Sequence, residues 1–257
     1  MHISDQLQRK LTFSKTPQRI ISLVPSQTEL LVSLGLEKSI VGVTKFCVHP
    51  VDIRKNTKVV GGTKNINFDR VRLLSPDIII CNKEENTKDI VETAATIAKV
   101  WVSDIYTIND VLRMITSLGE IFDVVESADN LISKIQTAKK DFQLYMCNKP
   151  NRNVAYLIWK NPYMAAGKNT FINHMLQLNK FENSVNLEDI RYPEVDFSSI
   201  KSVETVLLSS EPYPFKNSDC EEIKNALDVE VRLVDGEYFS WYGSRLIRAF
   251  EYFKSLH

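Results

Sequence analysis

RIISLVPSQTEL, at residues 19–30, is the stretch of sequence that decides the fold class. Its first half is a short β-rich run that ends at Pro25. Residues 26–29 (SQTE) follow as a capping box, a pattern that starts helices, and Gly35 is placed to close the helix. A strand that leads directly into a helix is the repeating unit of α/β proteins.

The same alternation of strand and helix continues as far as residue 102. We predict strands at 40–43, 77–81 and 100–102, with helices at 67–74 and 87–98. Strands separated by helices form a mostly parallel sheet that helices cover on both faces. Ligands of such sheets bind at the carboxyl ends of the strands.

A long helical segment divides the chain into two halves. The apolar spacing stays helical from residue 107 to residue 146, and about 20 residues of helix extend about 30 Å, enough to cross between domains. A second β-α set follows, with strands at 154–158, 205–208 and 230–234 and helices at 169–178 and 246–253. The sequence therefore predicts an α/β fold with two Rossmann-like lobes joined by a long interdomain α-helix. Its parts are an N-terminal extension (1–18), a first lobe (19–126), a connecting helix (127–148) and a second lobe (149–257).

Composition excludes several classes of partner. The 32 Lys and Arg residues balance 32 Asp and Glu residues, so no net field attracts nucleic acid or an anionic membrane. No apolar run approaches the roughly 18 residues that a membrane span requires. Residues 1–19 lack the continuous apolar stretch of a secretory signal, so we expect no export signal, and a cytoplasmic location stays open.

Motifs for catalysis or for an intrinsic cofactor are missing from the sequence. It has no G-x-G-x-x-G, G-x-S-x-G or H-E-x-x-H pattern, and Gly167-Lys168 fails as a phosphate loop because Asn169 follows. His49 and His174 are the only interior histidines, too few for a multi-histidine metal site. We therefore expect no catalytic residues, no metal ligands and no intrinsic cofactor, and we predict that the protein is not an enzyme.

Aromatic residues in expected loops are the stronger functional signal. Residues 237–243 (EYFSWYG) place four aromatics between the last strand and the last helix, where a ligand at the strand ends would lie. The same residues could equally belong to the core, as most aromatics do. Both interpretations stay open. The loop aromatics are Phe46, Trp159, Tyr163, Tyr192, Tyr213, Phe239, Trp241 and Tyr242.

Two sets of segments resemble the cobalamin and iron-siderophore binding proteins of ABC importers, in order and in spacing. Residues 19–30, 34–36 (LGL), 41–44 (VGVT), 67–70 (NFDR) and 75–80 (SPDIII) resemble the first lobe of that family. Residues 161–162 (NP), 167–168 (GK), 191–193 (RYP) and 241–245 (WYGSR) resemble its second lobe. The resemblance covers nearly the whole chain from residue 19.

The resemblance implies a receptor that holds a metal chelate between its lobes and delivers it to ABC permease subunits. Phe46 and Tyr192 match aromatic pocket residues of cobalamin-binding members. Thr63 and Asn82 stand where such a member has tryptophans, and Met164 replaces an aromatic, so the ligand is left open between cobalamin, a ferric siderophore and haem. The expected ligand-binding residues are Phe46, Lys64, Tyr163, Met164, Tyr192, Trp241, Tyr242 and Arg245.

Docking on the permease uses one carboxylate per lobe in this family. Asp69 matches the first-lobe position, whereas the second-lobe position falls on Ser198, which leaves Glu194, Asp196 and Glu211 as substitutes. The resemblance implies a periplasmic or cell-surface monomer. The alternative is a cytoplasmic protein or enzyme that handles a corrinoid or tetrapyrrole on the same fold, and a third reading is a receptor whose pocket has decayed.

Overall fold

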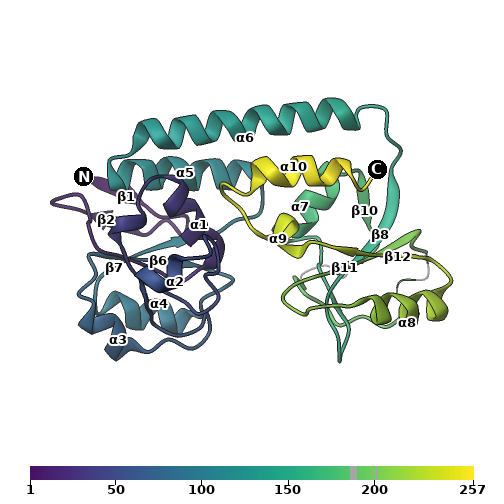
Figure 1. The fold of residues 1–257 in the computed structure, drawn as a ribbon, viewed down its shortest axis with the longest axis horizontal. Helices are drawn as coiled ribbons and strands as arrows, with labels where there is room; N and C mark the ends of the chain where they lie inside the picture. Colours follow the sequence, from purple (N-terminus) through teal and green to yellow (C-terminus); the bar gives the residue numbers. More distant parts are fainter. Residues whose placement is uncertain (186–189, 199, 201) are drawn as a thin grey trace. The chain divides into compact units, whose positions relative to one another are not determined.

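The computed structural model describes all residues except 186–189, 199 and 201. The chain forms two compact units, which we call the first lobe (residues 1–136 and 242–245) and the second lobe (residues 137–241 and 246–257). Helix α6 (Val125–Met146) runs from one into the other (Figure 1). Each lobe contains a parallel sheet, so the predicted α/β fold with a long bridging helix is confirmed.

The first lobe is built on a parallel sheet with the strand order β5-β4-β3-β6-β7. Its central strands β3 and β6 are entirely buried, as expected for a parallel sheet that is covered on both faces. The strands are β3 (Ile20–Ser22), β4 (Ile40–Val43), β5 (Lys58–Val59), β6 (Ile78–Asn82) and β7 (Lys99–Ser103). The α-helices are α1 (Pro25–Ser33), α2 (Ile53–Asn56), α3 (Phe68–Leu73), α4 (Lys88–Ala95) and α5 (Ile108–Phe122), and a 3₁₀ turn, η1 (Glu37–Ser39), precedes β4.

The start of α1 corrects one local prediction. The helix begins at Pro25 and its N-cap is Val24, which makes no side-chain cap, so residues 26–29 are not a capping box. The reason is that proline's fixed φ suits the first helical position, where its missing N–H costs nothing. A true capping box occurs at α5, between Thr107 and Asp110.

Residues 1–18, set apart above as an extension, pack against the first-lobe sheet. Strands β1 (His2–Ser4) and β2 (Lys10–Thr12) form an antiparallel pair. The loop between them bonds to β7, because the Gln6 N–H donates to the Val102 carbonyl (3.2 Å) and the Val102 N–H donates to Asp5 Oδ2 (3.2 Å). This pair therefore covers a strand edge that would otherwise be open to other chains.

The second lobe has the strand order β10-β8-β11-β12, all parallel, with β9 antiparallel on β8. Its two faces alternate along β8: Leu157 belongs to a cluster with Ile223 of α8, whereas the Tyr156 ring lies 5.0 Å from Phe239 of α9. The strands are β8 (Arg152–Trp159), β9 (Met164–Ala165), β10 (Phe181–Asn183), β11 (Thr205–Ser209) and β12 (Glu230–Val234). The helices are α7 (Phe171–Leu178), α8 (Asn217–Leu227), α9 (Gly236–Ser240) and α10 (Leu246–Lys254).

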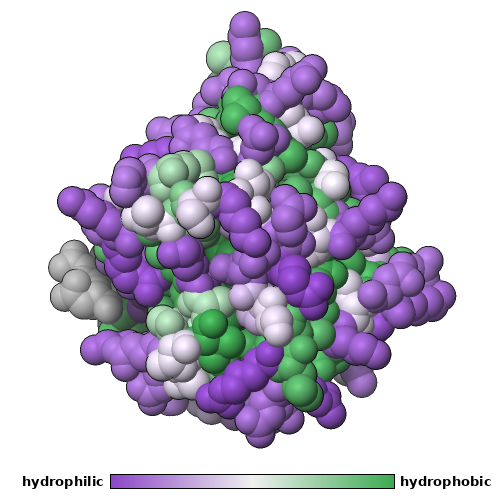
Figure 2. Space-filling view, turned by 90° about the vertical axis from the view of Figure 1, so that its left-hand side faces the viewer, coloured by the Kyte–Doolittle hydropathy of each residue, from purple (hydrophilic) through white to green (hydrophobic). Residues whose placement is uncertain are grey.

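Polar side chains dominate the face of the molecule on which the first lobe is seen in Figure 2, and apolar ones form small groups. Throughout the described part of the chain, every helix is too short or too polar to cross a bilayer.

Candidate functional site

Phe46 is the most prominent aromatic at the carboxyl ends of the first-lobe strands. It follows β4, and half of its surface (50%) is exposed, unusual for so large an apolar ring. The Lys45 ammonium lies 4.9 Å from the centroid of the Phe46 ring, and a Cβ added at Gly62 would lie 3.2 Å from the same ring. The Phe46 ring is therefore a flat apolar surface at the end of the sheet where ligands of α/β folds bind.

Lys64 lies at the same edge of the sheet, beyond β5. Its ammonium donates to the Glu84 carbonyl oxygen (2.5 Å). Next to it, burial raises the pKa of the Glu85 carboxyl, and the positive charge of Lys64 opposes that rise. The edge thus combines an exposed cation with a half-buried acid.

Asn82, the last residue of β6, organises the loop that follows this strand. It is buried, its Oδ1 accepts from the N–H groups of Glu84 and Glu85 (2.9 and 3.0 Å), and its Nδ2 donates to Ser103 Oγ (2.9 Å). Thr63 is also buried, and its carbonyl accepts from Asn86 Nδ2 (3.0 Å). Both residues shape the backbone and offer little surface to a ligand.

The predicted ligand residues at 241–245 are almost fully enclosed. Arg245 is 8% exposed and donates from Nε and Nη2 to the two carboxylate oxygens of Glu29, 2.9 Å each. Tyr242 is 7% exposed, and burial raises the pKa of its phenol. Both belong to the first lobe, although the chain on either side of 242–245 belongs to the second. This packing favours a structural role for the segment.

Residues 237–243, which were predicted to form an aromatic loop, are mostly part of a short helix, α9, so the prediction of a loop is wrong. Asp235 caps α9 by accepting from the Glu237 N–H, and Phe239 points into the core, fully buried. Trp241 is 7% exposed and its indole donates to Glu211 Oε1 (2.8 Å). Helix α9 is only five residues long, too short for a periodicity signal to separate it from a loop.

Tyr163 and Met164 lie at the start of β9, and Tyr192 lies on the segment that is hydrogen-bonded to this strand. The Tyr163 hydroxyl donates to Glu222 Oε1 (2.8 Å), and burial together with this bond raises the pKa of Tyr163 to about 12. Tyr192 is half-buried on a segment that pairs with β9, because the Ala165 N–H donates to the Pro193 carbonyl (3.0 Å). Three of the predicted ligand residues thus share one edge of the second lobe.

The predicted docking carboxylates differ in how accessible they are. Asp69, in the first turn of α3, has a side chain that is 91% exposed and pairs with Arg72 at 2.9 Å. Glu194 is exposed. Glu211 Oε1, in contrast, accepts from both Ser240 Oγ (2.6 Å) and the Trp241 indole, so it is engaged within the second lobe.

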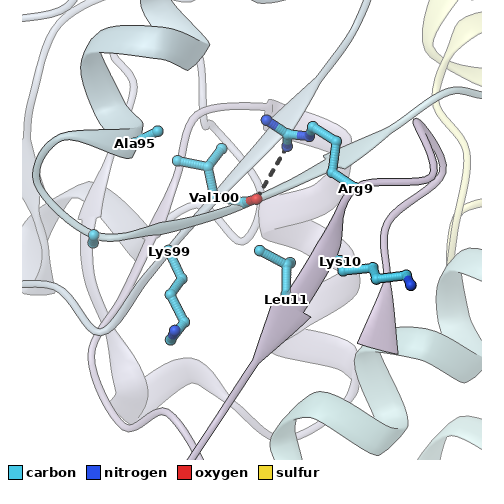
Figure 3. A pocket seen from close by; sticks show the side chains of 7 residues that line it. Arg9, Lys10, Leu11, Ala95, Lys99 and Val100 are labelled. Carbon is cyan, nitrogen blue, oxygen red and sulfur yellow. Dashed lines mark hydrogen bonds between the residues drawn. The ribbon is translucent and has the colours of Figure 1, made fainter. Parts of the chain in front are cut away.

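A cavity of about 350 Å³ lies elsewhere in the first lobe (Figure 3). It is lined by Arg9, Lys10, Leu11 and residues from the turn between α4 and β7. Lys99 and Val100 begin β7, so this cavity is at the amino end of that strand, away from the carboxyl edge. Among the described residues, no group of three or more His, Cys, Asp or Glu side chains is arranged to hold a metal ion.

Comparison with known proteins identifies the family. The profile of a family described as periplasmic binding protein matches residues 20–209, most of the chain, and the chain belongs to this family. Its members are transport components that bind substrates without converting them, as periplasmic proteins or lipoproteins outside the cytoplasm. The predictions of an ABC-importer substrate-binding protein and of a non-enzyme are therefore confirmed.

Two relatives illustrate the similarity in sequence. The uncharacterized ABC transporter substrate-binding lipoprotein YvrC of Bacillus subtilis is 28% identical over 71% of this chain, a match that spans only 60% of YvrC itself. The vitamin B12-binding protein of Pectobacterium atrosepticum is 22% identical over 91% of this chain and 86% of its own length.

Solved structures share the fold at low identity. The vitamin B12 binding protein BtuF of Vibrio cholerae has a TM-score of 0.79 at 16% identity, covering 93% of this chain and 96% of BtuF. The haem-binding protein RhuT of Roseiflexus has a TM-score of 0.80 at 16% identity, covering 93% of this chain and 98% of RhuT. At this level of identity the likeness concerns the fold alone.

Proposed function

We propose that this protein binds a metal chelate (cobalamin or another corrinoid, a ferric siderophore, or haem) and delivers it to the permease of an ABC importer. The observation that carries the proposal is the exposed Phe46 ring at the carboxyl edge of a parallel sheet, within a chain of the periplasmic binding protein family. Ligand pockets are mostly apolar with a few polar groups that fix orientation. Phe46 provides the apolar face, and Lys64 provides a cation for acidic groups of the chelate.

In the second lobe, Tyr163, Met164 and Tyr192 are the proposed ligand contacts. Relatives named for vitamin B12, haem and siderophore support a chelate in general and do not choose between these three. The replacement of tryptophans by Thr63 and Asn82, both buried, argues against a pocket shaped like that of a cobalamin receptor.

Delivery to a permease is proposed to use Asp69 on the first lobe and Glu194 on the second. Both carboxylates are exposed, and a carboxylate that meets an arginine forms strong charge-assisted hydrogen bonds. We place this activity in the periplasm or at the cell surface, as for the rest of the family.

The test is calorimetric titration of the purified protein with cobalamin, cobinamide, haem, a ferric tris-catecholate and a ferric tris-hydroxamate. Saturable one-to-one binding, with the chelate recovered unchanged, supports the receptor. Conversion of the bound chelate into a new species, followed by its absorption spectrum, would instead support the alternative, a cytoplasmic corrinoid- or tetrapyrrole-handling enzyme. Binding of none of the five chelates refutes the proposal.

A further inference from the structure

An aromatic pair, with Trp159 exposed and Tyr213 half-buried, ends two neighbouring strands of the second lobe. Trp159 is the last residue of β8, and Tyr213 follows the end of β11, the parallel neighbour of β8. Their ring centroids are 5.6 Å apart with an interplanar angle of 68°, an edge-to-face arrangement. The pair therefore lies at the carboxyl edge of this sheet, where α/β proteins bind ligands.

Met164 adds a third apolar group to this pair. It is the backbone partner of Trp159 in the antiparallel pairing of β9 with β8, at a step where the register of the two strands shifts. The resemblance to cobalamin-binding proteins implies an aromatic residue at the position of Met164. Trp159, its backbone partner, offers a flat aromatic surface beside it.

The exposure of Trp159 is hard to explain by packing alone. Its surface is 41% exposed, whereas the other two tryptophans, Trp101 and Trp241, are 0% and 7% exposed. A large ring left in water gains little for folding, but a ligand that covers it recovers the hydrophobic free energy.

The loops that carry the pair are already fixed in position. The Tyr213 N–H donates to the Ile158 carbonyl (3.3 Å), which ties the segment after β11 to the end of β8. The Lys160 ammonium donates to Asp219 Oδ1 (2.8 Å) and to Glu222 Oε2 (2.7 Å), which anchors the loop after β8 to α8. A surface held in place before binding loses little conformational entropy when a ligand arrives.

We propose that Trp159, Tyr213 and Met164 form a stacking platform that selects chelates with a planar π face. This inference rests on the proposed function and narrows its ligand class. The rings stack on flat conjugated surfaces, and the polarisable Met164 sulfur packs well against them. A tetrapyrrole and a catecholate siderophore both carry such a surface, whereas a chelate with only aliphatic hydroxamates does not.

The test compares three variants by calorimetry with haem, a ferric tris-catecholate and a ferric tris-hydroxamate. Trp159→Leu keeps an apolar side chain and removes the ring, Trp159→Phe keeps a ring, and Tyr145→Ala is the matched control, a 38% exposed aromatic on α6. Thermal unfolding of each variant verifies that it is folded.

We expect the wild-type protein to bind haem or the catecholate more tightly than the hydroxamate. Trp159→Leu should weaken that binding about tenfold or more, with Trp159→Phe between the two and Tyr145→Ala unchanged. The chelate whose affinity falls in Trp159→Leu, haem or the ferric tris-catecholate, is the one that stacks on the platform.

Two outcomes overturn the platform while leaving the receptor intact: unchanged affinity of Trp159→Leu for the planar chelate, or wild-type preference for the hydroxamate. If the wild-type protein binds none of these chelates or the corrinoids, the proposed function fails first, and the platform fails with it.

Discussion

Replacing Arg245 by methionine removes one partner of a nearly buried ion pair and retains most of the apolar volume. The two bonds from Arg245 to Glu29 are both 2.9 Å long, and the side chains are 8% and 21% exposed. Breaking a buried pair by removing one partner costs about 3–5 kcal/mol, because the other charge stays desolvated. Since Glu29 keeps some contact with water, we expect about 3 kcal/mol for Arg245→Met.

The complementary substitution Glu29→Met takes the carboxylate away from the nearly buried Arg245 guanidinium and should also lower the free energy of unfolding. The double substitution removes both charges, so its cost should be well below the sum of the two single costs. Urea unfolding, followed by tryptophan fluorescence, measures these costs. The background protein carries Trp159→Phe and Trp241→Phe, so that the signal comes from Trp101 in the first lobe.

Additive costs in this cycle would refute the reasoning, because they would mean that the two charges do not interact. The chelate affinity of Arg245→Met separates the two roles of this residue. Lost affinity with unchanged stability would support the ligand role predicted from the sequence, and lost stability with unchanged affinity would support the structural one.

Three further predictions concern ligand binding, delivery and pH. Phe46→Ala should weaken chelate binding by about 1–3 kcal/mol in calorimetry, and Val51→Ala, an even more exposed apolar control (79% against 50%), should not. Asp69→Lys should abolish uptake in a reconstituted importer while chelate affinity in solution stays normal. Hydrogen bonds from Lys160 lower the pKa values of Asp219 and Glu222. The two ionised carboxylates therefore stabilise the fold fully above about pH 5, and this stabilisation is lost as the pH falls through the lowered pKa values. The thermal midpoint should therefore drop between about pH 5 and pH 3, and less so in Lys160→Met, whereas an equal drop in both proteins would contradict this.

The sequence by itself determined the order of the main elements and the class of protein. A parallel strand covered on both faces has to be a continuous apolar run, so β6 can be recognised in the sequence from the isoleucines at residues 78–80. The connecting helix can be predicted because its helical spacing of apolar residues persists over 22 residues. The order and spacing of short segments along the chain then indicated the binding-protein family. Elements of two or three residues, such as β1, β2 and β9, carry no comparable pattern.

Only the tertiary structure decided which of the candidate residues are exposed. Trp241, Tyr242 and Arg245 form a motif that indicates a ligand site, yet Arg245 is paired with Glu29, 216 positions earlier in the chain. Trp159 and Tyr213 are more than fifty positions apart, and the pairing of β8 with β11 brings them together at one edge. Local sequence specifies helices and strands because the apolar residues of each recur with a fixed period along the chain. Whether an aromatic ring is buried or free depends instead on contacts between distant segments, which no local pattern records.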